Sequence, residues 1–293
     1  MAQLDWEGLT SWYDVHGEPG DRLPIVLCHG GPGATHDYLL SLRALAAGGR
    51  QVVLYDQVGN GNSQHLRDAP GDFWTVDLFR RELRALVEHL GWSDGYHVLG
   101  QSWGGMLAME HALEHPPGLR SIVVADSPAS IPLWVAEANG LREELPVDVQ
   151  AALTRHEAAG STDTPEYREA MQVFYRRHVC RLDPWPEEVV RTFALMDEDL
   201  TVYRTMNGPS EFHVVGTIRD WDITERLGEI DVPTLLVSGR HDEATPRILG
   251  EIRDRIPNAE WVLLEESSHL PHVEEPERFV EAVEGFLERV ETR

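Results

Sequence analysis

Residues 96–116, with the sequence YHVLGQSWGGMLAMEHALEHP, decide the fold class. The apolar run 96–100 is typical of a buried strand, and the segment after Ser102 is typical of a helix, so the serine falls on the turn between them. Gly100 and Gly104 stand two residues before and two residues after the serine. Only small residues fit beside such a sharp turn, which lifts the hydroxyl above the carboxyl edge of a sheet and next to a helix N-terminus. The pattern therefore predicts that Ser102 is a nucleophile.

Five more short apolar runs resemble 96–100. They are continuous rather than alternating, as expected for strands that are buried on both faces of a parallel sheet. The segment 75–91, TVDLFRRELRALVEHLG, places its leucines on one helical face and ends at a glycine. This alternation of strands and helices predicts an open, mostly parallel α/β sheet with right-handed connections. The five runs are 24–28, 51–55, 121–125, 234–238 and 260–264.

The alternation breaks between about residues 129 and 220, where no comparable strand run occurs. Helical spacing is present instead, as in the apolar positions of 167–179. A block of roughly ninety residues is far longer than the usual connection between two strands. We therefore expect a core of residues 1–128 and 221–293 with a helical cap, residues 129–220, inserted between core strands. A few connecting helices that lie on the sheet are the simpler alternative.

Composition argues against several classes of function. Acidic residues number 50 against 25 basic ones, a net charge of -25, which disfavours nucleic acid and anionic membranes as partners. The two cysteines, Cys28 and Cys180, are too few for a disulfide framework and lie in no metal-ligand cluster, so we expect no metal and no cofactor. The N-terminus lacks an apolar signal region, and no stretch approaches the roughly 18 apolar residues of a membrane span. We expect a cytoplasmic protein.

The motif HGGPG, residues 29–33, follows the first of the predicted core strands. Glycines let the backbone come close to a ligand and expose N–H groups to it, whereas the proline of the motif has no N–H. A donor for the oxyanion would therefore come from Gly30, Gly31 or Gly33, and we assign it to Gly31. The second donor would be the N–H of Trp103, the residue after the nucleophile.

A serine hydroxyl is a weak nucleophile and needs a base. Asp242 and His269 each follow a predicted strand, so both are expected at the carboxyl edge of the sheet, where ligands bind in open α/β folds. We assign His269 as the base and Asp242 as the acid that orients it. His272 and Asp126 are the alternatives, because His272 lies three residues after His269 and Asp126 also ends a predicted strand.

Six motifs together resemble the proline iminopeptidases, which are prolyl aminopeptidases of the α/β-hydrolase superfamily. The resemblance covers nearly the whole chain and is closest to the tricorn-interacting aminopeptidase branch and the related L-amino-acid amidases. The fold and triad motifs are shared across the superfamily, whereas MNGPSEF is narrower and points to enzymes that act at a free amino end. The motifs are HGGPG (29–33), YDQVGNGNS (55–63), GQSWGG (100–105), MNGPSEF (206–212), DWDIT (220–224) and RHDEATP (240–246).

The resemblance implies that Glu211 and Glu243 hold the α-amino group of the substrate, because glutamates at these motif positions do so in the family. Paired carboxylates in a partly enclosed site would also suit an ammonium group on physical grounds, although most glutamates are simply solvated. The activity implied is release of an N-terminal residue, proline or another small or apolar one, through an acyl-enzyme. The substrates would be short peptides or aminoacyl amides with a free amino terminus. An L-amino-acid amidase or esterase, and a ligand receptor on a hydrolase fold, remain the alternatives.

Overall fold

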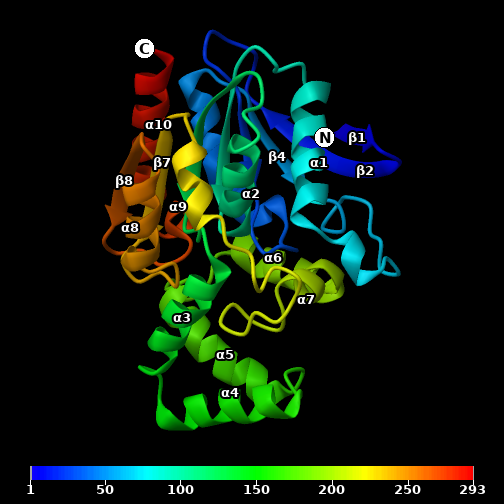
Figure 1. Cartoon of the computed structure of the whole chain (residues 1–293), viewed down its shortest axis with the longest axis vertical. Coiled ribbons are helices and arrows are strands. Elements are labelled where there is room, and N and C mark those ends of the chain that lie inside the picture. The colour runs from blue at the N-terminus through cyan, green and yellow to red at the C-terminus, as the bar shows by residue number, and fades with distance from the viewer. Residues whose placement is uncertain (1, 293) are drawn as a thin grey trace.

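The computed structural model describes residues 2–292, and within them the chain forms an eight-stranded sheet in the order β1-β2-β4-β3-β5-β6-β7-β8 (Figure 1). The strand β2 pairs antiparallel with β1 and β4, and every pair from β4 through β8 is parallel. The mostly parallel α/β sheet is therefore confirmed. The strands are β1 (Ala2–Trp6), β2 (Leu9–His16), β3 (Ile25–Cys28), β4 (Val52–Asp56), β5 (Tyr96–Gln101), β6 (Leu119–Ala125), β7 (Thr234–Gly239) and β8 (Ala259–Leu264).

All six predicted strands are present, as β3 to β8. The hairpin of β1 and β2 is not among the predicted strands. Its residues are mixed in polarity and only partly buried, so they form no continuous apolar run. Glu7 and Gly8 join its strands with positive φ values of 47° and 82°, as a tight two-residue hairpin turn requires. The hairpin extends the sheet away from the strands that carry the motifs.

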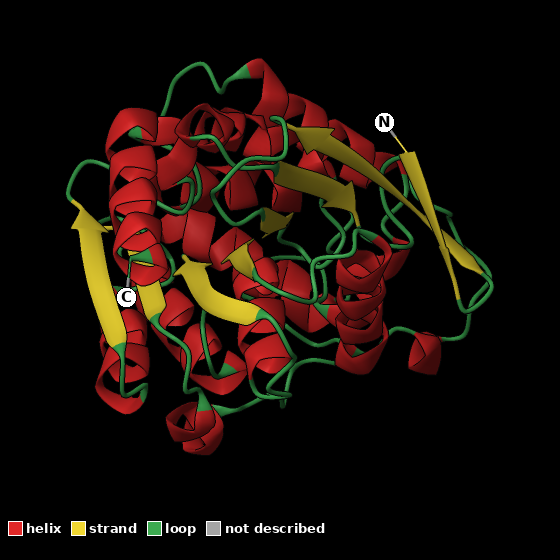
Figure 2. Ribbon diagram, turned by 90° about the horizontal axis from the view of Figure 1, so that it is seen from above, coloured by secondary structure: helices red, strands yellow, loops and turns green. Residues whose placement is uncertain are grey.

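Helices cover both faces of the sheet (Figure 2). On one face, α1 (Val76–His89), α2 (Trp103–Ala112) and α8 (Pro246–Arg255) share a hydrophobic cluster with alternate strand residues such as Val26 and Val98. On the other face, the 3-10 helix η1 (His36–Gly48) and α10 (Pro276–Glu291) pack on Leu27 and Leu99. This two-sided burial explains why the strand runs are continuous. Two short helices complete the layers, η2 (Gly71–Phe73) and α9 (Pro271–Glu274).

The chain between β6 and β7 is helical, as its spacing predicts. Part of this segment projects beyond one end of the sheet, where α3, α4 and α5 lie at the bottom of Figure 1. Its own hydrophobic cluster includes Leu153, Phe174 and Phe212. The limits 129–220 of a separate cap remain a prediction. The helices are α3 (Ile131–Arg142), α4 (Val147–Ala159), α5 (Pro165–His178), α6 (Glu187–Glu198), α7 (Thr201–Met206) and the 3-10 helix η3 (Thr224–Glu229).

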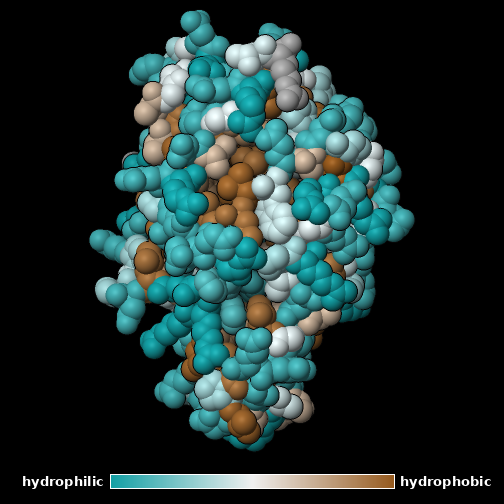
Figure 3. Space-filling view, turned by 90° about the vertical axis from the view of Figure 1, so that its left-hand side faces the viewer, coloured by the Kyte–Doolittle hydropathy of each residue, from teal (hydrophilic) through white to brown (hydrophobic). Residues whose placement is uncertain are grey.

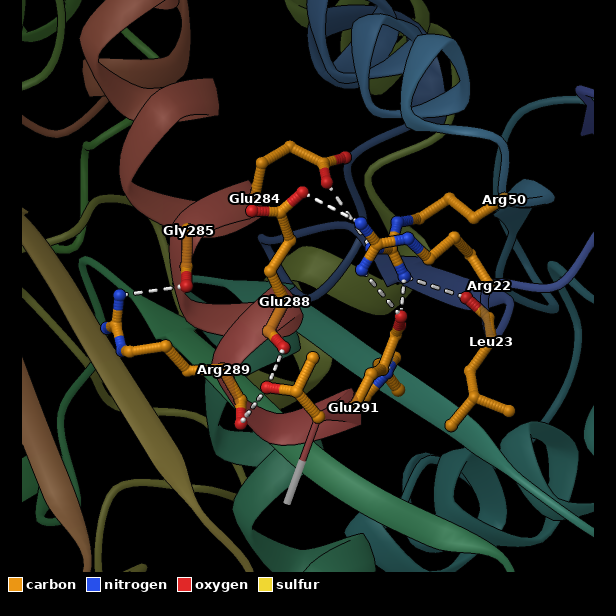
Figure 4. A network of polar contacts seen from close by, with 10 residues as sticks. Arg22, Leu23, Arg50, Glu284, Gly285, Glu288, Arg289 and Glu291 are labelled. Atoms are coloured by element: carbon orange, nitrogen blue, oxygen red, sulfur yellow. Dashed lines mark hydrogen bonds and ion pairs between the residues drawn. The ribbon is translucent and has the colours of Figure 1, made fainter.

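A network of paired charges occupies the opposite end of the sheet, where the parallel strands begin (Figure 4). The fully buried guanidinium of Arg50 donates to the carbonyl oxygen of Leu23 at 2.8 Å and to Glu291 Oε1 at 2.7 Å. Arg22 Nη1 donates to the other oxygen of Glu291 at 3.1 Å, and His97 Nε2 lies 3.2 Å from Glu291 Oε1. The network therefore fastens α10, at the end of the described chain, to the starts of three strands.

On the side of the molecule that carries β8, the surface is mainly hydrophilic, and apolar residues gather mostly in a recessed strip (Figure 3). Within residues 2–292, every helix is too short or too polar to cross a lipid bilayer.

Candidate active site

Ser102 lies at the carboxyl end of β5, immediately before α2. Its backbone has φ 55° and ψ −123°, a strained conformation for a residue other than glycine. A Cβ atom at Gly100 would lie 1.9 Å from the carbonyl oxygen of Gly104, and one at Gly104 would lie 2.0 Å from that of Cys28. Both glycines are therefore required for the turn to form, and the predicted strand-to-helix elbow is present. The serine is 8% exposed, and it lines a pocket between the sheet edge and α5 and α6.

The HGGPG loop lies beside this serine. The N–H of Gly30 already donates to the hydroxyl of Tyr38 at 2.6 Å, which leaves Gly31 or Gly33 of the three glycines as a free donor. Gly31 lines the same pocket as Ser102 and has a φ of 111° that only glycine adopts easily. Trp103 is the first residue of α2, so its N–H has no acceptor within the helix.

His269 and Asp242 are brought together by the loops that follow β8 and β7. His269 Nδ1 lies 2.7 Å from Asp242 Oδ1, which also accepts the N–H of Ala244 at 2.9 Å. Both side chains are buried, and His269 lines the Ser102 pocket. An imidazole held in this way through Nδ1 presents Nε2 to the pocket, as a general base for a serine requires.

His272 occupies a different environment. Its Nε2–H donates to the carbonyl oxygen of Tyr38 at 3.1 Å, and its ring packs against Tyr38 and Phe279. Burial lowers the pKa of His272 to about 3, so the ring is neutral and structural. Of the two histidines, the structure places only His269 beside Asp242. Asp126 is not remote, however, and lies next to both of these residues.

Glu211 and Glu243 both line the pocket that contains Ser102. Glu211 lies in the segment between α7 and η3, and its Oε1 accepts the hydroxyl of Tyr203 at 2.6 Å. Burial raises the pKa of Glu211 even though the Tyr203 hydrogen bond and His269 act in the other direction. Glu243 is fully buried, and neither of its oxygens accepts a hydrogen bond from residues 2–292. Burial and then the charges of Glu211 and Asp242 raise the pKa of Glu243 well above its ordinary value.

The pocket around Ser102 is small and largely apolar. Its volume is about 60 Å³, and Val179, Val189 and Leu270 contribute to its walls. A second cavity of about 180 Å³ lies among the helices between β6 and β7. The two cavities share Glu211 and three other lining residues, so they adjoin one another. The three others are Tyr175, Phe193 and Met196.

Several side chains at the site carry no motif that would reveal them in the sequence. The Tyr38 hydroxyl donates to Gln101 Oε1 at 2.6 Å, and Gln101 Nε2 donates to the carbonyl oxygen of His269 at 2.8 Å. The indole Nε1 of Trp134 donates to the carbonyl oxygen of Glu211 at 2.7 Å, while its ring lies 5.6 Å from that of His269. The only signal for Gln101 is its place inside the serine elbow.

One group among residues 2–292 has the spacing of metal ligands, namely Asp126, Asp242 and His269, whose candidate ligand atoms lie within 4.8 Å of one another. Two of these residues already share the hydrogen bond between Nδ1 and Oδ1. A cation bound there would compete with that hydrogen bond for the same lone pairs.

The chain matches the family model described as alpha/beta hydrolase fold over residues 24–276, and it therefore belongs to the α/β-hydrolase family. A proline iminopeptidase of Saccharolobus solfataricus is 38% identical to it over 283 residues, which cover 97% of this chain and 90% of that protein. Two solved structures are similar along nearly the whole length. The proline iminopeptidase of Mycobacterium smegmatis has a TM-score of 0.92 and 46% identity, and VinJ has a TM-score of 0.97 and 50% identity; each comparison covers 99% of this chain and 98% of the other.

The chain belongs to the proline iminopeptidase family, and it is a serine hydrolase. The family resemblance of the sequence motifs is thereby confirmed. The closer relation to the tricorn-interacting aminopeptidase and amidase branch remains a prediction.

Proposed function

We propose that this protein is a serine aminopeptidase that releases an N-terminal proline, or another small or apolar residue, from short peptides. In this reaction Ser102 attacks the carbonyl carbon of the first residue, and His269 accepts the serine proton. The N–H groups of Gly31 and Trp103 hold the oxyanion, and Asp242 stabilises the imidazolium. His269 then gives its proton to the leaving amine, and water releases the acyl-enzyme by the same steps.

The observation that carries this proposal is the buried carboxyl pair, Glu211 and Glu243. A buried carboxylate without a partner is costly, and a cation that enters the pocket would remove that cost. Charge-assisted hydrogen bonds from an ammonium or iminium group would compensate both residues at once. A substrate with a blocked amino end would leave them unpaired, so the pair selects for a free terminus.

We further propose that the helical segment 129–220 acts as a cap that encloses the amino end of the substrate. Three of its residues support this role: Trp134 and Tyr203 hold Glu211 by hydrogen bonds, and Tyr175 lines both cavities. An enclosed site has a low effective dielectric, which strengthens the attraction between the carboxyl pair and a cation.

The test compares kcat/KM for proline 4-nitroanilide with that for its N-acetyl form. Wild type should cleave the free amine and leave the acetylated substrate uncleaved. Glu211→Gln and Glu243→Gln keep the shape and remove a charge, so each should lower kcat/KM for the free amine by about ten- to a hundredfold. Glu225→Gln, at a residue 90% exposed, is the matched control and should change nothing.

If wild type cleaves both substrates equally well, the aminopeptidase proposal is wrong and a general esterase or amidase replaces it. A panel with prolinamide and a proline-first dipeptide separates amidase from peptidase activity. Barely measurable turnover on the whole panel would favour a ligand receptor.

A further inference from the structure

Asp126 lies at the end of β6, beside β7, and the proposed reaction gives it no role. Its φ of 52° places it in the left-handed region, which aspartate and asparagine tolerate better than most residues. Its side chain is fully buried, and Oδ1 accepts the N–H of Gly239 at 3.2 Å. A buried, strained carboxyl group is costly unless its surroundings compensate it.

The carboxyl groups of Asp126 and Asp242 are neighbours with complementary gaps in their hydrogen bonding. One oxygen of each lies within 4.8 Å of the other and of a ring nitrogen of His269. Asp242 Oδ1 accepts two hydrogen bonds, whereas Oδ2 of Asp242 and Oδ2 of Asp126 receive none from any donor in residues 2–292. A single proton between these two oxygens would satisfy both.

Two adjacent buried carboxyl groups cannot both ionise, so one of them retains a proton. Asp242 Oδ1 accepts the N–H groups of both His269 and Ala244, whereas Asp126 Oδ1 accepts that of Gly239, so the retained proton is assigned to Asp126. Burial, then the charge of Asp242 and a hydrogen bond with its carboxyl group, raise the pKa of Asp126 well above the ordinary value.

We propose that Asp126 is a positioning residue: as a neutral carboxylic acid it donates a hydrogen bond to Asp242 Oδ2, and thereby fixes the carboxylate that orients His269. The sequence offers Asp126 as a rival to Asp242 for the acid, and in this arrangement the two residues act together. The inference rests on the proposed use of Ser102, His269 and Asp242, but not on the amino-group specificity.

Other titratable groups also face this pair. Glu243 follows Asp242, Glu274 of α9 adds negative charge near Asp126, and His178 of α5 lies close enough to interact with Asp242. The negative charge of Glu274 favours retention of the proton on Asp126, because a further negative charge on Asp126 would be repelled by it.

The first experiment measures kcat and KM for Asp126→Gly and Asp126→Asn. Glycine removes the donor and still accepts the positive φ, so kcat should fall about ten- to a hundredfold with little change in KM. Asparagine retains an N–H donor for Asp242 and should recover most of that loss. Asp231→Gly and Asp231→Asn, at a residue 73% exposed and before the start of β7, are the matched controls.

The second experiment follows the free energy of unfolding with pH. A raised pKa in the folded state means that the folded chain keeps a proton that the unfolded chain releases above about pH 4, so wild-type stability falls as pH rises from there. Asp126→Asn has no such proton, and its stability relative to wild type should increase from pH 4 to pH 8. An infrared difference spectrum of wild type minus Asp126→Asn at pH 7 should show the band of a protonated carboxyl group.

The proposal is overturned if Asp126→Asn is as impaired as Asp126→Gly, if its relative stability is independent of pH or falls, or if the infrared band is missing. It is also overturned if EDTA changes the rate, since the group would then hold a cation. All variants are assayed on proline 4-nitroanilide, on 4-nitrophenyl acetate and by labelling of Ser102 with a fluorophosphonate. The ester and the label report on the triad without an amino group, so the Asp126 effect persists there even if the aminopeptidase proposal fails.

Discussion

The two ends of the parallel sheet differ in how far their buried charged groups are paired with other residues. Where the strands begin, the Arg50 side chain is buried and that of Glu291 is 9% exposed, and each makes several polar contacts, although Arg50 Nε finds no acceptor among residues 2–292 (Figure 4). Where the strands end, buried carboxyl groups such as Glu243 and Asp242 keep oxygens that accept no hydrogen bond from residues 2–292. Removal of one partner from a buried ion pair lowers the free energy of unfolding, because the other charge is left uncompensated. A buried carboxyl group without a partner already lowers that free energy in the native protein. The first arrangement joins α10 to the starts of three strands, and the second leaves carboxyl oxygens free to bind a cationic group of the substrate, as proposed above.

The largest expected effect is a loss of kcat from substitutions where the strands end, at Ser102 and His269. Ser102→Ala and His269→Ala should each lower kcat by about 10⁴-fold or more, because the members of a triad act as a unit. Urea unfolding should show little change for either variant.

His272→Ala is the control, since His272 is a buried packing residue. It should lower stability and leave kcat close to wild type. A larger loss of kcat from His272→Ala than from His269→Ala would show that the base is assigned to the wrong histidine.

The next effect belongs to the opposite end of the sheet. Arg50→Met removes one partner of a buried pair and leaves Glu291 poorly compensated, so the free energy of unfolding should fall by about 3–5 kcal/mol. The kcat/KM of the folded fraction should be unchanged. Urea titration at pH 7 measures the loss, and Arg22→Met, at a side chain 33% exposed, should lower the free energy of unfolding far less. Equal losses from both variants would contradict the distinction between buried and exposed pairs.

A smaller effect on the free energy of unfolding is expected from the unpaired carboxyl group of Glu243. The pKa of Glu243 is raised in the folded state, so its contribution to stability is lost as pH rises above the ordinary glutamate value near 4.5. Glu243→Gln should therefore be more stable than wild type at pH 7 and less active. Thermal unfolding at pH 4 and pH 7 should show that the gain is larger at pH 7. A variant that is destabilised at pH 7 would mean that Glu243 is already compensated in the free protein.

The smallest effect is expected at Glu291, where the pKa is lowered rather than raised, so that stability is lost at low pH rather than at high pH. Burial raises the pKa of Glu291, but hydrogen bonds with His97 and Arg50 outweigh it and lower the value to about 2. The stability supplied by Glu291 is therefore present above about pH 4.5 and is lost as pH falls towards 2. The free energy of unfolding of Glu291→Gln should therefore fall less steeply than that of wild type between about pH 4.5 and about pH 2. An equally steep fall in both proteins would show that other carboxyl groups cause the loss.

Local chemistry made part of this molecule predictable. The elbow at Ser102 follows from glycines whose Cβ atoms would strike the backbone, and the strands follow from continuous apolar runs. The β1–β2 hairpin could not be predicted in the same way, because its residues are partly exposed and mixed in polarity. The proposed role of Glu211 rests mainly on the resemblance, since little in the local sequence separates it from a solvated glutamate.

The rest of the site depends on contacts between distant segments. The sequence places Asp126 and Asp242 at the same sheet edge, but their adjacency follows from the pairing of β6 with β7. Glu243 lines one pocket together with residues of α5 and α6, which are distant from it in the sequence. Neither arrangement can be predicted from the spacing of residues along the chain.

The relay from Gly30 through Tyr38 and Gln101 to the backbone of His269 has a consequence for protein engineering. These hydrogen bonds join the HGGPG loop, the turn at Ser102 and the loop that carries His269 into one unit, so a new side chain in any of them is expected to disturb all three. The walls contributed by α5 and α6 lie outside this unit. Directed evolution towards bulkier acyl groups should therefore accumulate its substitutions at positions such as Val189 and Met196, and leave Tyr38 untouched.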